Sequence, residues 1–172
     1  MTFAAAIRVC LRKYATFKGR APRSEYWWFI LFVVLGIVVL GVIDMALFGT
    51  SMIETDDGMI VAESNGPLAQ VFNLAMVIPM LSVGWRRMHD TGRSGLYLLY
   101  PLIVTVGLGT AMAFFGGIGA LNGGPGEGLA LLILFPALII LSISPLLVLW
   151  WLTRPSQPGA NPYGPNPHEV LK

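Results

Sequence analysis

The sequence predicts an all-α, polytopic membrane protein with four transmembrane helices and an amphipathic N-terminal helix at the membrane interface. Composition indicates the class, because 55% of the 172 residues are apolar and only 12% are charged, a balance that does not suit a water-soluble surface. Hydropathy indicates the spans, because four apolar runs are each close to the ~20 residues that a helix needs to cross a ~30 Å hydrocarbon core. The predicted spans are 27–49, 68–85, 96–115 and 129–152.

The basic residues all fall on one side of this pattern. Six precede the first run, three lie between the second and third, and two follow the fourth: Arg8, Arg12, Lys13, Lys18, Arg20, Arg23, Arg86, Arg87, Arg93, Arg154 and Lys172. The other two loops carry only acidic charges, at Glu54, Asp56, Asp57, Glu63 and Glu127. Under the positive-inside rule, this distribution predicts that both termini and the middle loop are cytoplasmic.

Segment 3–17 is expected to form the amphipathic helix. Its apolar residues recur at a helical spacing, at Phe3, Ile7, Cys10, Leu11, Tyr14 and Phe17. Arg8, Arg12 and Lys13 lie away from this stripe. Two arrangements fit the pattern: the stripe lies on the inner leaflet with its cations at lipid phosphates, or it packs on the transmembrane helices. Because the same cations interrupt any apolar core of a signal sequence, no cleavable signal peptide is expected.

One acidic residue falls inside a predicted span. Asp44 lies about one turn from the outer end of the first run, where the surrounding apolar residues favour insertion by more than one carboxylate opposes it. Gln70 and Asn73 follow the start of the second run at a comparable depth. We therefore expect Asp44 to face Gln70 or Asn73 in a small polar cluster with a structural role, with an ion or proton site as the alternative.

Prolines and glycines modify the later spans. The prolines are Pro79, Pro101, Pro136 and Pro145. Each removes a backbone donor and is expected to bend its helix unless a hydroxyl such as that of Ser142 compensates. The glycine-rich stretch 116–128 is expected to form a short outer loop. The tryptophans mark the cytoplasmic ends of three spans, as interfacial aromatic residues do: Trp27, Trp28, Trp85, Trp150 and Trp151.

Three polar stretches, 17–28, 86–95 and 158–167, are predicted to meet on the cytoplasmic face. Their order and spacing resemble the bacterial Domain of Unknown Function 805 family, with its Gly-Arg-x-x-Arg-x-Glu-Tyr/Phe-Trp motif, Arg-Arg-Leu-His-Asp-x-Gly-Arg-Ser-Gly loop and Asn-x-Tyr-Gly-Pro tail. In this chain Met88 replaces the leucine, and Pro162 stands where a basic residue is common. The resemblance implies a small protein of the bacterial inner membrane, and the family name records no assigned activity.

These stretches bring five arginines and two carboxylates together. The arginines are Arg20, Arg23, Arg86, Arg87 and Arg93, and the carboxylates are Glu25 and Asp90. One interpretation is a structural charge network in which Glu25, His89 and Asp90 fix the loop and the helix ends. The other is a site for an anionic lipid headgroup or another phosphorylated ligand, because guanidinium binds phosphate as it binds carboxylate.

Catalysis is a third interpretation. His89 and Asp90 supply a base and a carboxylate, but neighbours on a helix point about 100° apart and no nucleophile stands in a recognisable motif. His89 and His168 are the only histidines and lack the spacing of metal ligands. We therefore predict no catalytic residue, no metal and no other cofactor. The single cysteine, Cys10, also excludes an intrachain disulfide.

The C-terminal segment is rich in proline, glycine and asparagine. We place the four-helix domain at 1–167 and the cytoplasmic tail at 153–172. Five prolines from Pro155 onward exclude a helix in the tail. The tail is then either disordered, as termini of this composition often are, or folded back so that Asn161 and Tyr163 cap the 86–95 loop.

The basic face is the strongest indication of function. We expect a non-enzymatic membrane scaffold or accessory factor that contacts anionic lipid through this face, or a membrane-protein partner or a second copy of the chain. The first alternative is a transporter or channel subunit, although the spans offer few polar side chains for a conduit. The second is an enzyme acting on a phosphorylated or lipid headgroup. Nucleic acid is not an expected partner.

Overall fold

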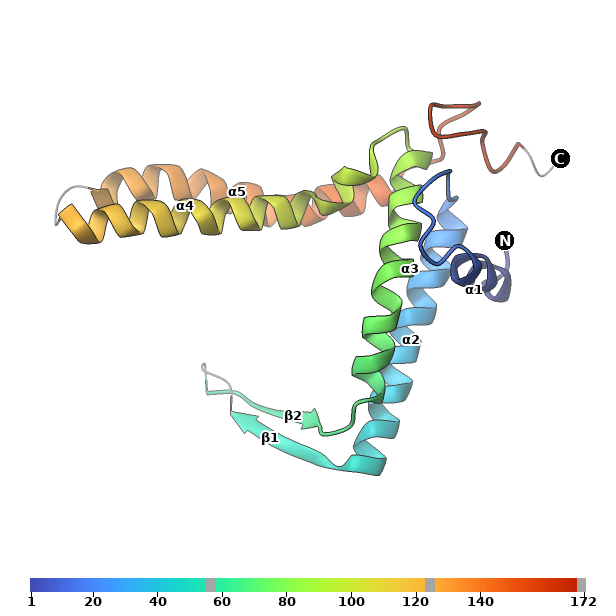
Figure 1. Ribbon diagram of the computed structural model, residues 1–172, viewed down its shortest axis with the longest axis horizontal. Helices are drawn as coiled ribbons and strands as arrows, with labels where there is room; N and C mark the ends of the chain where they lie inside the picture. Colours follow the sequence, from blue (N-terminus) through green and yellow to red (C-terminus); the bar gives the residue numbers. More distant parts are fainter. Residues whose placement is uncertain (55–57, 123–125, 170–172) are drawn as a thin grey trace.

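The computed structural model describes residues 1–54, 58–122 and 126–169, and the chain is mostly helical (Figure 1). α2 and α3 lie side by side, and α4 and α5 form a second pair (Figure 1). In chain order the elements are α1 (Phe3–Arg12), α2 (Arg23–Phe48), β1 (Thr50–Glu54), β2 (Ile60–Ser64), α3 (Leu68–Asp90), the 3-10 helix η1 (Gly95–Leu99), α4 (Tyr100–Asn122) and α5 (Gly126–Thr153).

The two helical pairs meet at one end. In Figure 1 the α4–α5 pair runs away from the α2–α3 pair at a steep angle. Contact between the pairs joins α3 to η1 and to α5. α1 and the tail that follows α5 lie at this same end (Figure 1). We call it the basic end and define it by Arg23 at the start of α2 and Asp90 at the end of α3.

Among the described residues, three helices are long and apolar enough to cross a membrane, judged by length and composition: Arg23–Phe48, Leu68–Asp90 and the part of α5 from Phe135 to Thr153. The described part of the next apolar segment, Gly95–Ala111, covers η1 and the first part of α4. Apolar side chains remote from the basic end are exposed, as at Leu74, where 75% of the surface is accessible. A contiguous apolar surface of this kind suits hydrocarbon and not water.

The mostly helical chain also contains a short β-hairpin, which the sequence did not predict. β1 and β2 pair antiparallel, with Thr50 opposite Ser64 and Glu54 opposite Ile60. Each strand has only five residues. At that length, an alternation of apolar and polar residues is difficult to separate from an irregular loop.

The glycine-rich stretch also differs from the predicted outer loop. α4 continues as a helix to Asn122, and α5 already begins at Gly126. Glycine disfavours a helix by about 1 kcal/mol relative to alanine. In hydrocarbon, however, every backbone amide must be bonded within its own segment, which favours continuation of the helix. The remaining residues of the predicted loop, 123–125, lie outside the described residues.

α1 ends at Arg12, earlier than the predicted limit of residue 17. Ser82 of α3 supplies the reason, because its hydroxyl lies 3.0 Å from the carbonyl oxygen of Lys13 and 2.8 Å from that of Thr16. A hydroxyl on these carbonyls favours a turn over another helical turn. The segment that follows α1 is therefore hydrogen-bonded to α3.

The face of α1 that packs on the other helices is short. Ala6 and Cys10 are buried, and the ring of Phe3 meets that of Trp28 edge-on at 5.7 Å between centroids. Leu11 and the basic side chains of α1 stay exposed. α1 thus has one packed face and leaves both apolar and charged groups accessible.

Tyr14 compensates for the proline in α3. Pro79 has no N–H, so the carbonyl of Ala75, four residues earlier, lacks its usual helical donor. The hydroxyl of Tyr14 donates to this carbonyl. A residue of the segment after α1 therefore satisfies a group that proline leaves free in α3.

Within α5 the compensation is local. Pro145 leaves the carbonyl of Leu141 without its helical donor, and the hydroxyl of Ser144 donates to that carbonyl at 2.9 Å. Ser142, the expected compensating residue, donates instead to the carbonyl of Leu138 at 2.9 Å.

Buried apolar side chains gather at the basic end. One cluster consists of Cys10, Ala21, Phe29, Val33 and Val83, and a second consists of Met88, Val148 and Leu152. The apolar core therefore lies at the same end as the buried side chains of Glu25, Arg86 and Asp90.

Candidate functional site

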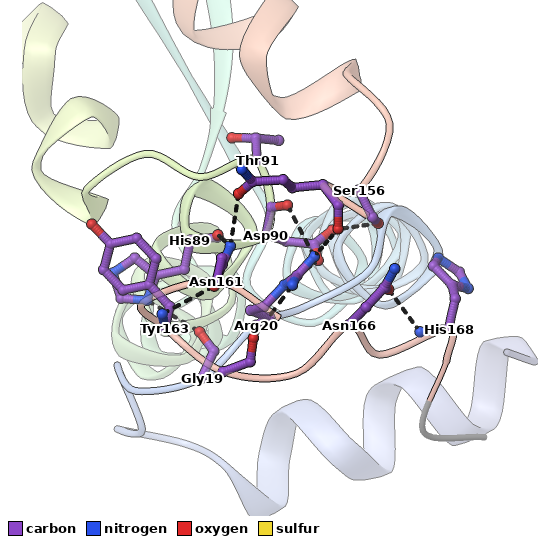
Figure 2. A network of polar contacts seen from close by, with 12 residues as sticks. Gly19, Arg20, His89, Asp90, Thr91, Ser156, Asn161, Tyr163, Asn166 and His168 are labelled. Carbon is purple, nitrogen blue, oxygen red and sulfur yellow. Dashed lines mark hydrogen bonds and ion pairs between the residues drawn. The ribbon is translucent and has the colours of Figure 1, made fainter. Parts of the chain in front are cut away.

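Asp90 is the centre of a buried charge network. Its side chain is fully buried at the end of α3. Oδ1 accepts from Arg20 Nε at 3.0 Å, and Oδ2 accepts from Arg87 and from the hydroxyl of Ser156. Figure 2 shows Arg20 and Ser156 converging on this carboxylate. One side chain therefore connects the segment before α2, the end of α3 and the tail.

Arg20 uses its remaining donors on the tail. One terminal nitrogen donates to the carbonyl of Gly159 at 2.7 Å and the other to that of Gln157 at 2.5 Å. Only 7% of Arg20 is exposed. Its guanidinium is thus bonded within the protein rather than presented to a ligand.

Arg87 caps the end of α5. Its Nε donates to the carbonyl of Leu152 at 3.0 Å, and a terminal nitrogen donates to that of Arg154. The last carbonyls of a helix lack internal donors and carry partial negative charge, so a cation is stabilising there. Arg87 therefore joins the two helical pairs through both Asp90 and α5.

Glu25 and Arg86 form a second buried ion pair. The thiol of Cys10 lies 3.8 Å from the same carboxylate oxygen of Glu25. Burial, and then the charge of Glu25, raise the pKa of the Cys10 thiol to about 12. Nε and one terminal nitrogen of Arg86 are buried without a partner among the described residues. This cation is consequently the least well satisfied group of the network.

The tail lies against the turn that follows α3. The ring of Tyr163 stacks on that of His89, with 3.8 Å between centroids and 4° between planes. The amide of Asn161 donates to the carbonyl of His89 at 2.9 Å, and the backbone N–H of Gln157 donates to the carbonyl of Asp90 at 2.9 Å. Figure 2 shows Tyr163 and Asn161 beside His89.

His89 and Asp90 have different partners. His89 Nδ1 lies 3.1 Å from the carbonyl of Gly19, which requires a proton on Nδ1 because a carbonyl only accepts. Asp90 instead faces Arg20 and Arg87. The two neighbours are not coupled as a base and its orienting carboxylate. Among the described residues no group of His, Cys, Asp and Glu is placed to hold a metal ion.

The two other predicted arginines lie outside the network. Arg23 is exposed. Arg93 is half-buried over the ring of Trp151, 5.2 Å from its centroid, and donates to the carbonyl of Thr91 at 3.2 Å. The structure thus brings Arg20, Arg86 and Arg87 into buried contacts and leaves Arg23 and Arg93 accessible.

Sequence reasoning missed the tail groups that complete the network. They are the hydroxyl of Ser156 and the carbonyls of Gln157 and Gly159. Backbone carbonyls have no sequence signature, because every residue has one. The turn after α3 has a clearer sequence signal in its two glycines. Gly92 has φ +76°, and a Cβ on Gly95 would lie 2.1 Å from Trp85, so both positions favour glycine.

Asp44 lies at the opposite end of the α2–α3 pair. Its buried carboxylate accepts from the backbone N–H of Leu68 at 3.1 Å and of Ala69 at 2.8 Å. The expected partners, Gln70 and Asn73, have exposed side chains. The carboxylate caps α3 because backbone donors at a helix start have no helical acceptors and carry partial positive charge.

Replacing Asp44 with alanine should therefore loosen the first turn of α3. The loss of a capping carboxylate costs about 1 to 2 kcal/mol. Hydrogen–deuterium exchange at the amides of Leu68 and Ala69 should accelerate roughly tenfold or more, whereas Asn73→Ala should leave them within about twofold. Unchanged exchange in the Asp44 variant would contradict this role.

Apolar helices of spanning length, joined at one end by buried charges, define a polytopic membrane protein. The chain belongs to the family described as "Protein of unknown function (DUF805)", whose model matches residues 14–165. It is similar to inner membrane protein YhaH of Escherichia coli (strain K12), with 36% identity over 97 residues that cover 56% of this chain and 72% of that protein. It is also similar to inner membrane protein YhaI of the same strain, with 31% identity over 105 residues that cover 61% and 77% of the two chains. No solved structure matches the chain.

Proposed function

We propose that this chain is a non-enzymatic scaffold of the bacterial inner membrane, with both termini in the cytoplasm and a basic face that binds anionic phospholipid. The division of its cations supports this proposal. Arg20, Arg86 and Arg87 are buried and bonded internally. The remaining basic face consists of Arg8, Arg12, Lys13, Lys18, Arg23 and Arg154, which are exposed and make no ion pair with the described residues.

The surroundings of these cations suit a membrane surface. Each basic residue near an anionic leaflet contributes on the order of 1 kcal/mol to binding. Trp28 of α2 and Trp150 of α5 are exposed at the same end, and Arg154 lies 4.8 Å from the centroid of the Trp150 ring. Tryptophan rings favour the headgroup level, where one side is apolar and the other is wet. The cations and these rings would therefore meet the inner leaflet together.

The contacts of the other candidate groups support a scaffold over the alternatives. Both carboxylate oxygens of Asp44 accept backbone N–H groups, which favours a structural role over an ion pathway. The separate partners of His89 and Asp90 favour a structural role over catalysis. A membrane-protein partner or a second copy would use the same exposed face.

Native mass spectrometry tests the proposal. The purified protein is equilibrated with equal amounts of phosphatidylglycerol and phosphatidylethanolamine, and the lipid retained is counted. We expect the wild type to prefer phosphatidylglycerol and the triple variant Arg8→Gln, Arg12→Gln, Arg23→Gln to lose roughly fivefold for each cation removed. The control variant Gln70→Ala, at the opposite end of the α2–α3 pair, should retain as much phosphatidylglycerol as the wild type. Equal retention of the two lipids by the wild type would refute the proposal.

A further inference from the structure

We infer that a cavity between α1, the segment before α2 and the tail binds the phosphate of one anionic phospholipid. The inference deepens the proposed function and rests on it. The cavity has a volume of about 380 Å³, within the range of small-molecule sites. Among the residues that line it are Val9 of α1, Lys13 directly after α1, Pro22, and Tyr163 and Pro165 of the tail.

The charges at the cavity favour an anion. Lys13 is exposed and makes no ion pair with the described residues. The carboxylate of Glu25 also lines the cavity, but it is neutralised by Arg86. Arg20 adds positive charge at the wall, although its donors already bind Asp90 and the tail. Lys13 is therefore the group that is available to contact a phosphate.

The apolar part of the cavity favours a lipid over a free anion. Val9, Pro22 and Pro165 give it walls that suit the glycerol and upper acyl region of a phospholipid. The cavity is also continuous with the basic face, because Lys13 belongs to both. An anionic lipid offers both the charge and the apolar surface that these walls match.

One consequence is that the tail and the lipid should stabilise each other. Tyr163 lines the cavity and also stacks on His89. If the lipid binds more tightly when Tyr163 lines the cavity, its binding must stabilise the docked tail by the same free energy. Binding should therefore slow hydrogen exchange in residues 157–164.

The test compares two lysines. Lys18 is exposed five residues after Lys13 and is not among the residues that line the cavity. Wild type, Lys13→Gln and Lys18→Gln are titrated with short-chain phosphatidylglycerol, and the first bound molecule is counted by native mass spectrometry. We expect Lys13→Gln to weaken this binding about fivefold to tenfold and Lys18→Gln by no more than about twofold. Val9→Phe, which fills the cavity and keeps every charge, should also weaken it.

The other outcomes separate this inference from the proposed function. Equal losses of lipid binding in the two lysine variants would refute the cavity as the binding site. They would still agree with a diffuse attraction of anionic lipid to the basic face. The absence of any preference over phosphatidylcholine of the same chain length in the wild type would refute both. Inorganic phosphate that competes as well as the lipid would refute a lipid as the occupant. Protection of Cys10 from a thiol reagent checks that each variant is folded.

Discussion

Asp90→Ala is expected to be the most damaging single substitution at the basic end. It removes the carboxylate that Arg20 and Arg87 share, so both buried cations lose their acidic partner. Removal of one partner from a buried ion pair costs about 3 to 5 kcal/mol, because the remaining charge stays out of water. The apparent melting temperature in detergent, followed by the near-ultraviolet circular dichroism of the tryptophans, should fall by roughly 10 °C.

Two control variants separate charge from shape. Asp90→Asn keeps a hydrogen-bond acceptor of similar size, so its melting temperature should fall less than that of the alanine variant. Glu169→Ala removes an exposed carboxylate that accepts hydrogen bonds from Gly159 and Asn166 of the tail, so it should shift the melting temperature by no more than a few degrees. A melting temperature of the Asp90→Ala variant equal to that of the wild type would mean that the network contributes little.

Glu25→Ala should be nearly as damaging. It removes the carboxylate that pairs with Arg86, two of whose buried side-chain nitrogens already have no partner among the described residues. The expected cost is again about 3 to 5 kcal/mol. In the wild type the Cys10 thiol is fully buried and its pKa of about 12 leaves roughly one thiolate in ten thousand at pH 8, so alkylation is very slow. The variant should be alkylated much faster, because α1 loosens and one cause of the raised pKa is removed.

A double variant gives the sharper result. Glu25→Leu combined with Arg86→Leu removes both charges and fills the space with apolar side chains. Because Arg86 already leaves two buried nitrogens without partners, the double variant should be more stable than either single variant. Losses that simply add would show that the two side chains do not act as a pair.

The sequence allowed the apolar helices to be predicted, but it was less informative about where they end. The apolar pattern predicts the second span at 68–85, whereas α3 continues to Asp90. The apolar pattern stops at Arg86 because the residues that follow are charged. The helix continues because α5, the segment before α2 and the tail supply partners for those charges. Hydropathy does not record such partners.

The members of the candidate site were also easier to predict than their contacts. The three motifs are specific enough to indicate that Arg20, Asp90 and Asn161 belong to one region. Which groups each side chain meets depends on carbonyls that the folded chain brings close, such as those of Gln157 and Gly159. The partners of Asp44 could not be derived for a similar reason. They are backbone amides at the start of α3, and the β-hairpin between α2 and α3 places that start beside the end of α2.

Arg20 and Arg87 hold the tail against the end of α3, and the cations of the basic face stay exposed. Hydrogen–deuterium exchange of the full-length protein in lipid nanodiscs tests this arrangement most directly. The amide of Gln157, which is bonded to the carbonyl of Asp90, and that of Asn161, bonded to the carbonyl of Gly164, should exchange at least tenfold more slowly than in an unfolded chain. Exchange of both amides at the unfolded rate would contradict the account.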